Sequence, residues 1–258
     1  MQQQDNIYSI MMPLFSKMEL DPVAFLEEMQ DAPREHNQYG FSCELVCAWA
    51  RMLCFQPEET LKICDTCLPM LNKPNRIGLF TDFLLIKSSA LSMLMRLAEM
   101  KSTLEEAQIA AQPSHHIYPG TAINLSLASY YFRAQEVSKA EYLTIKSVGL
   151  LDRVSEPYLK VDLLWRLATL YNFLRKYSVA IGYFVQCFQL CNKYRFKLRA
   201  LQTSVELVAL NSNLGYFTRA EKFYNYGIKL AEQLRIPAYQ IGLSFNYGLL
   251  YKLQGKLP

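Results

Sequence analysis

The chain has 258 residues, of which 51% are hydrophobic, so it holds enough apolar material for a core and is not a disordered polyelectrolyte. With 10 glycines, 11 prolines and no alternating β-branched runs, the composition favours long helices joined by short connections. The net charge of +4 is uneven, because residues 1–160 carry 14 Lys+Arg against 19 Asp+Glu and residues 161–258 carry 13 against 4. The basic second half suits an acidic protein, a nucleic acid or a neighbouring domain as a partner.

Nothing in the chain resembles a secretion signal or a membrane segment. Residues 1–6 lack the basic stretch and the apolar core of a secretory signal, and no apolar run is as long as a membrane span. The seven cysteines are an odd number in a chain of this length, which argues against a disulfide framework and for reduced thiols packed as small hydrophobic groups. We therefore expect a cytoplasmic protein.

Residues 1–40 are predicted to form a capping pair of helices at one end of the fold. Asp21 and Pro22 are typical of the start of a helix, and apolar residues follow them at helical spacing. These residues are Val23, Phe25, Leu26 and Met29.

From residue 41 onwards the sequence repeats every 40 residues, in blocks that start near 41, 81, 121, 161, 201 and 241. The eighth position of each block is small or fairly small: Ala48, Ser88, Ala128, Ala168, Val208 and Gly248. We call such a set of equivalent positions in successive blocks a column. A second column of mostly small residues lies in the second half of the blocks, at Thr60, Met100, Ala140, Ala180 and Ala220. Further columns follow at steps of three and four residues, which places them on one helix face, and the small residues let two helices approach closely.

The expected turns fall between these columns. Gly215 and Gly255 are 40 residues apart and are predicted to form hairpin turns. The segment 56–59, Gln-Pro-Glu-Glu, is typical of a turn that enters a helix with an acidic first turn. Pro157 and Pro237 mark the links between hairpins. Each block is thus predicted to be one pair of antiparallel helices.

The segment 246–256, Asn-Tyr-Gly-Leu-Leu-Tyr-Lys-Leu-Gln-Gly-Lys, resembles the tetratricopeptide repeat family, since a small residue, an aromatic residue and a turn glycine stand in the family's order. The resemblance covers residues 41–258 and implies an all-α, right-handed superhelical solenoid of antiparallel helical hairpins. The 40-residue spacing exceeds the family's usual ~34 and is similar to variant repeats of bacterial regulators. The first two blocks depart from the pattern, with Arg51 and Leu91 at the usual aromatic place.

The sixth block ends before its second helix, so we expect a truncated last hairpin. Its apolar residues Tyr247, Leu250, Tyr251 and Leu253 would then be left without their usual cover. The expected occupant is a missing C-terminal domain or a second copy of the chain in a homodimer.

The cysteines offer the one hint of catalytic or metal chemistry. Cys64 and Cys67 form a CxxC motif, with Cys43, Cys47 and Cys54 nearby, so a metal- or thiol-dependent enzyme remains an alternative. However, the two motif cysteines occupy the same columns as Phe184 and Cys187, which predicts a packing role. We nominate no catalytic residue, no metal ligand and no cofactor.

Residues 193–199 alternate basic and aromatic side chains, as a surface that stacks nucleic acid bases would. The run lies where one hairpin ends and the next begins, and basic residues also favour a helix C-terminus. We interpret it as a solvated link between hairpins.

The family resemblance implies that the first helix of each hairpin lines a concave groove that takes an extended peptide, a helix or a neighbouring domain. Arg133 and Arg166 are expected to pair with acidic groups of the partner, and Asn172, Asn213 and Asn246 to bond its backbone. The full set of predicted groove positions is Ser129, Phe132, Arg133, Trp165, Arg166, Thr169, Asn172, Phe173, Asn213, Phe245 and Asn246.

The expected function is that of a non-catalytic interaction and regulatory module. By resemblance, it would be the N-terminal sensory region of a larger bacterial signalling protein, such as a diguanylate cyclase or a transcription regulator. The alternative is a free-standing adaptor whose basic half docks an acidic partner.

Overall fold

The computed structural model describes residues 2–31, 37–71, 76–112 and 117–255. Over these residues the chain forms thirteen α-helices and no strand. The helices are α1 (Gln2–Leu20), α2 (Pro22–Asp31), α3 (Gln38–Leu53), α4 (Pro57–Leu71), α5 (Ile77–Met93), α6 (Leu97–Ala111), α7 (Ile117–Arg133), α8 (Val137–Val148), α9 (Pro157–Phe173), α10 (Tyr177–Tyr194), α11 (Lys197–Asn213), α12 (Phe217–Gln233) and α13 (Pro237–Leu253). None of the described helices is long and apolar enough to span a membrane.

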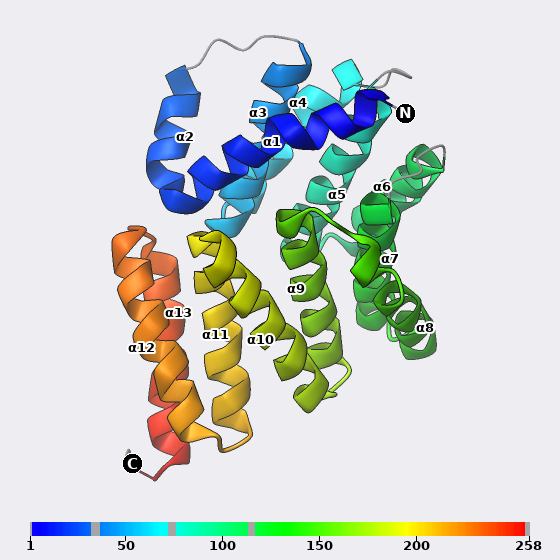
Figure 1. Cartoon of the computed structure of the whole chain (residues 1–258). Coiled ribbons are helices and arrows are strands. Elements are labelled where there is room, and N and C mark those ends of the chain that lie inside the picture. Colours follow the sequence, from blue (N-terminus) through cyan, green and yellow to red (C-terminus); the bar gives the residue numbers. More distant parts are fainter. Residues whose placement is uncertain (1, 32–36, 72–75, 113–116, 256–258) are drawn as a thin grey trace.

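Five helical hairpins follow one another from α3 to α12, and α13 packs beside the last of them (Figure 1). Each hairpin pairs a first helix, such as α9, with a second helix, such as α10, and the second helix packs on the first helix of the next hairpin. The molecule is an all-α helical-repeat solenoid, which confirms the fold class predicted from the sequence.

The turn of each hairpin from α3 to α12, and the end of α13, contains one residue in the left-handed backbone region. These residues lie 40 positions apart: Phe55 (φ 61°), Met95 (58°), Gln135 (64°), Arg175 (57°), Gly215 (77°) and Gly255 (67°). In the turns from Phe55 to Gly215 the next N–H reaches back to the first helix, as Lys176 N does to Tyr171 O at 2.9 Å. This hydrogen bond ends the helix. The predicted hairpin turn at Gly215 is confirmed, Gly255 has the same left-handed backbone just after α13, and the other four positions use a side-chain-bearing residue.

The small-residue columns form the contact between the two helices of each hairpin. Ala48, Ala128 and Ala168 are fully buried, and in the first hairpin the Thr60 hydroxyl donates to the carbonyl oxygen of Ala48 at 3.3 Å. This bond joins the two columns directly, because neither side chain is large enough to keep the helices apart.

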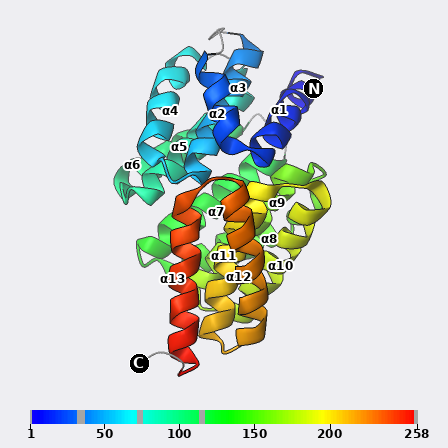
Figure 2. The ribbon, with the colours of Figure 1, turned by 90° about the vertical axis from the view of Figure 1, so that its left-hand side faces the viewer.

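Helix α1 does not take part in the regular stacking. It runs across the upper ends of other helices, and its contacts extend from α3 and α5 to α11 (Figures 1 and 2). Asp21, which follows α1, pairs with Arg235 at 3.1 Å, and the Tyr239 hydroxyl of α13 donates to the carbonyl oxygen of Leu53 at 2.9 Å. The N-terminal helices therefore close against the last helices of the solenoid.

The uncovered face of α13 differs from the one expected. Leu250 is fully buried, and Tyr247 stacks on Tyr224 of α12 with ring centroids 3.8 Å apart, because α12 covers this side of α13. The exposed apolar residues are Ile241 (70%), Phe245 (74%) and Leu253 (50%). Of the four residues predicted to lack cover, Leu253 is thus the exposed one, while Tyr247 and Tyr251 are partly buried. The last residues, 256–258, lie outside the described chain.

Candidate functional site

The first helices of successive hairpins present equivalent positions to a common inner face. One such series is Ser126 on α7, Arg166 on α9, Glu206 on α11 and Asn246 on α13, each 40 residues after the last. Arg166 Nη1 donates to Ser126 Oγ at 3.0 Å, so these two members of the series are in contact. The inner face therefore carries a row of polar side chains of differing charge.

Four of the predicted residues occur in a cluster at the C-terminal ends of α7 and α9. Phe132 stacks on Phe173 with ring centroids 5.3 Å apart, and the Arg133 guanidinium lies 5.8 Å from the Phe173 ring. Asn172, half-buried, belongs to the same turn of α9. Arg133 Nη1 also donates to the Met95 sulfur at 2.8 Å, while its buried Nε has no partner within the described part of the chain.

Arg166 lies elsewhere and already has internal acceptors. Its Nε donates to Asp162 Oδ2 at 2.7 Å, its Nη1 to Ser126, and its side chain is only 13% exposed. We therefore remove Arg166 from the residues expected to pair with a partner's acidic groups. Thr169 is likewise occupied, since its hydroxyl donates to the carbonyl oxygen of Trp165 in the same helix at 2.9 Å.

The remaining predicted residues spread along the inner face. Ser129 and Trp165 are partly buried, and the indole N–H of Trp165 is buried without a partner among the described residues. Asn213 at the end of α11 and Phe245 on α13 are exposed, and Asn246 is half-buried. The structure thus separates these residues from the cluster around Phe173.

Glu206 is a member of the polar row that sequence reasoning missed. Its carboxyl group is half-buried, burial raises its pKa, and no hydrogen bond or ion pair joins it to another residue within the described ranges. Its place 40 residues after Arg166 was the available signal. A basic group of a ligand would find an acceptor here that has no internal competitor.

A second polar network is buried between α1 and the N-terminal ends of the first helices, centred on Asp162. The Asp162 carboxylate accepts hydrogen bonds from Tyr118 at 3.1 Å, from Arg166 at 2.7 Å and from Arg199 Nη2 at 2.8 Å. The Arg199 guanidinium also lies over the Trp49 ring, 5.1 Å from its centroid. Sequence reasoning missed this network.

The interpretation of residues 193–199 as a solvated link is wrong at three positions. Phe196 is 4% exposed, Leu198 is fully buried and Arg199 is 2% exposed. The cause is that α11 begins at Lys197, so Arg199 falls in its first turn and points into the molecule. Lys193, Tyr194 and Arg195 are exposed, as expected.

Helix α1 contributes Glu19 and Tyr8 to this buried region. Glu19 Oε2 accepts the Arg199 backbone N–H at 3.0 Å, and the Tyr8 hydroxyl hydrogen-bonds to Asp82 of α5. Burial raises the pKa of Glu19 to about 7, although the N–H and the charge of Arg199 act in the opposite direction. Burial likewise raises the pKa of Asp82 to about 7.

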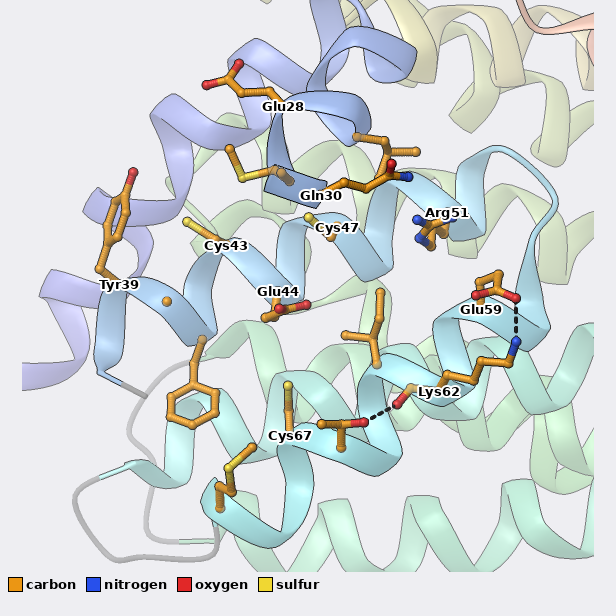
Figure 3. Close-up of a pocket in the computed structure, with 17 residues that line it drawn as sticks. Glu28, Gln30, Tyr39, Cys43, Glu44, Cys47, Arg51, Glu59, Lys62 and Cys67 are labelled. Atoms are coloured by element: carbon orange, nitrogen blue, oxygen red, sulfur yellow. Dashed lines mark hydrogen bonds and ion pairs between the residues drawn. The ribbon is translucent and has the colours of Figure 1, made fainter. Parts of the chain in front are cut away.

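A cavity of about 590 Å³ lies between α2, α3 and α4 (Figure 3). Cys43, Cys47 and Cys67 line it together with apolar residues of α2 and α4, and its rim is charged, with Lys62 paired to Glu59 at 2.7 Å. Burial raises the pKa of the Cys43 thiol, which keeps it protonated and a poor nucleophile.

The CxxC cysteines have the packing role predicted for them. Cys64 is fully buried and donates to the carbonyl oxygen of Phe83 at 3.8 Å, and Cys67 is 3% exposed. Cys187, in the same column as Cys67, is fully buried and lies 3.5 Å from the Thr203 hydroxyl. Within the described ranges, no group of three or more His, Cys, Asp or Glu side chains could hold a metal ion.

No model of a known protein family matches the chain, and no curated protein matches it in sequence. Solved structures do match. A Rap protein complexed with Competence and Sporulation Factor has a TM-score of 0.68 and 14% identity, covering 98% of this chain and 77% of that one. The apo form of RapI has a TM-score of 0.52 and 11% identity, covering 100% and 99%.

BtubC (BKLC) from P. vanneervenii is also similar, with a TM-score of 0.59 and 17% identity, covering 80% of this chain and 84% of that chain. At these identities the likenesses concern the fold. The chain shares the all-α helical-repeat fold of these three proteins.

Proposed function

We propose that this protein is a regulatory interaction module that binds a polypeptide on the inner face of its solenoid. The observation that carries the proposal is the chemical mixture on that face: stacked Phe132 and Phe173, the Arg133 guanidinium beside them, and the Glu206 carboxylate without an internal partner. An apolar anchor together with charged groups of both signs suits a polypeptide better than a nucleic acid, which requires a surface of one sign.

Each group has a definite role in this proposal. The aromatic pair contacts an apolar side chain of the ligand, and Glu206 accepts hydrogen bonds from a Lys, an Arg or a free amino terminus. Asn172, Asn213 and Asn246 bond the ligand's backbone, since an amide side chain both donates and accepts. The Rap protein of similar fold, which was crystallised with Competence and Sporulation Factor, supports a ligand on a solenoid of this kind.

The cellular setting also belongs to the proposal. We infer a cytoplasmic protein of bacterial signalling, whose ligand is a free peptide, a partner protein or an adjoining output domain such as a diguanylate cyclase or transcription regulator. The adaptor alternative rests on the charge of +9 in residues 161–258. It would place an acidic partner on exposed basic residues such as Lys193 and Arg195, and its affinity would fall steeply with added salt.

A random peptide library displayed on phage, selected against the full chain, tests the proposal. We expect enriched peptides to carry basic residues and to bind the Glu206→Gln variant about tenfold more weakly, the loss of one charged hydrogen bond. Phe173→Ala should weaken the same peptides. Tyr142→Ala, at a 65% exposed position on the outer helix α8, is the matched control and should change nothing. Peptides that tolerate both inner-face changes but are lost on Tyr142→Ala would place binding on the outer face.

A further inference from the structure

Helix α1 packs across α3, α9 and α11 as an amphipathic helix lies in a groove. Its apolar stripe consists of Met11, Leu14, Phe15 and Met18, at helical spacing, and all four are buried. Phe15 stacks on Tyr158 of α9 with ring centroids 4.0 Å apart and meets Trp49 of α3 edge-on at 6.3 Å. We call the surface beneath this stripe the α1 seat: Trp49, Tyr158, Phe196 and the first turn of α11.

The polar part of this contact is poorly matched. Asp82 Oδ1 and Arg199 Nε are buried without a hydrogen-bond partner within the described ranges, while the Tyr158 hydroxyl faces Glu19. Buried polar atoms without partners destabilise the contact that buries them. Pro13 lies inside α1 and removes one backbone hydrogen bond from it. The apolar stripe thus holds α1 in place against an electrostatic cost.

The neighbouring helix α2 is anchored mainly by Phe25, which is 1% exposed. The cavity of about 590 Å³ separates much of α2 from α3 and α4. Lys17 of α1 and Glu28 of α2 pair at 2.6 Å, which ties the two helices to each other. Beyond this hairpin, Asp21 makes an exposed ion pair with Arg235, and exposed pairs contribute little. Helices α1 and α2 can therefore leave as one unit once the α1 seat is lost and Phe25 leaves the core.

We propose that the α1 seat is a docking surface for an amphipathic helix of another polypeptide, and that α1 occupies it in the free protein as an intramolecular competitor. The partner is specified by what α1 presents: apolar residues in the spacing of Met11, Phe15 and Met18, followed directly by an acidic residue like Glu19. That acid accepts the Arg199 N–H in the first turn of α11, where the helix dipole also favours an anion.

This inference deepens the proposed function, because both place a polypeptide on the first helices of the hairpins. The two sites are nonetheless separate. Phe132 and Phe173 lie at the C-terminal ends of α7 and α9, whereas Tyr158 and Arg199 lie at the N-terminal ends of α9 and α11. A variant can therefore disturb one site and leave the other intact.

The test uses a fluorescein-labelled peptide of residues 2–20 and the full chain with Phe15→Asp, which weakens the chain's own α1. Fluorescence anisotropy should show this variant binding the peptide at least tenfold more tightly than the unchanged chain, where the tethered helix competes at an effective concentration on the order of millimolar. Leu20→Asp is the matched control, because Leu20 lies on the same helix but is 52% exposed. The Leu20→Asp chain should bind the peptide no better than the unchanged chain does. A labelled peptide that itself carries Phe15→Asp should bind neither the Phe15→Asp chain nor the unchanged chain.

Circular dichroism establishes that the variants are folded. A folded Phe15→Asp chain that does not bind the peptide overturns the proposal, as does equal binding by all three proteins. Hydrogen exchange on the unchanged chain gives a second measurement that needs no variant. We expect α1 and α2 to exchange together and well before α9 and α11, whereas exchange of α1 at the same rate as α11 would also overturn the proposal. If the labelled α1 peptide does not bind but Glu206→Gln still weakens the phage-selected peptides, this inference fails and the proposed function stands.

Discussion

Gly227 lies at the point where α12 comes closest to its neighbours. A Cβ atom added there would stand 2.5 Å from Ser204 Oγ and 3.1 Å from Leu243 Cδ1. Ser204 is buried and bonded to the carbonyl oxygen of Leu201, so it has little freedom to move aside. Gly182 on α10 is the opposite case, since it is exposed and nothing lies within 4 Å of an added Cβ.

The two glycines should therefore respond to alanine with opposite signs. Gly182→Ala should stabilise the protein by about 0.5–1 kcal/mol, because alanine favours a helix interior over glycine. Gly227→Ala gains the same preference but overpacks the contact among three helices, and we expect a net loss of about 1–2 kcal/mol. Urea unfolding followed by circular dichroism measures both. A stabilised Gly227→Ala protein would mean that α11 and α13 shift without cost.

Individual residues also show where sequence reasoning reached its limit. The small columns were predictable, because residues such as Ala128 and Ala168 recur at a fixed spacing. Asp162 and Arg199 follow no such rule: they are buried because each satisfies the other, at 2.8 Å and across 37 residues of sequence. A helical pattern shows which face a charged residue occupies, but it cannot show whether another element supplies its partner.

At the scale of single elements, α1 is the helix whose contacts depend on protonation. Glu19 faces Tyr158 of α9, Cys191 of α10 and Arg199 of α11. Asp82 of α5 faces Tyr8 of α1 and, at longer range, Asp162 of α9. Burial raises the pKa of both carboxyl groups to about 7, so the folded protein binds their protons more tightly than the unfolded chain does.

Stability should consequently fall as the pH rises. The stabilisation is complete below the unfolded pKa values, near 4, and is lost as the pH rises through 7. For Glu19 the free energy of unfolding should change by about 3 kcal/mol over this pH range. Glu19→Gln should reduce the slope of the unfolding free energy against pH. Glu27→Gln, at an exposed position of α2, should leave that slope unchanged. Urea unfolding between pH 5 and 8 measures it, and a Glu19→Gln protein with the original slope would contradict the assignment.

The hairpins were foreseeable at this scale, but the path of α1 was not. Periodicity and the Asp21-Pro22 start predicted two helices before residue 41, and the Asp21 carboxylate does accept the Ala24 N–H at 3.0 Å. Nothing in residues 1–40 indicates that α1 reaches α11, since the complementary surface is assembled from several later helices. Of the four hairpin turns without glycine, Pro57 indicated the first, whereas the turns at Met95, Gln135 and Arg175 carry no glycine to signal a left-handed residue.

At the scale of the whole molecule, the solenoid departs from nearest-neighbour behaviour. In an ordinary repeat array each unit contacts only the units beside it. Here the Tyr239 hydroxyl bonds Leu53 O, its ring lies 5.0 Å from Phe55, and Asp21 pairs with Arg235. The last helices therefore support the first hairpin, and we expect the chain to unfold more cooperatively than an open array.

Removing this closure should cost stability in two steps. Tyr239→Phe deletes the bond to Leu53 and should cost about 1 kcal/mol. Tyr239→Ala also removes a 2% exposed ring and should cost about 3–5 kcal/mol, with faster hydrogen exchange in both α3 and α13. Tyr216→Ala, at a 49% exposed position, is the control and should cost under about 0.5 kcal/mol. Faster exchange confined to α13 would show that the closure does not couple the two ends.

The contact between Glu19 and Arg199 also constrains how the protein is made. The two residues are 180 positions apart. At about 5–20 residues per second, a ribosome needs roughly 10–40 seconds to synthesise that interval. During this time the emerging N-terminal segment has lost the shelter of the exit tunnel but cannot yet meet Arg199. Nascent chains of this protein should therefore be clients of ribosome-associated chaperones until α11 has been translated.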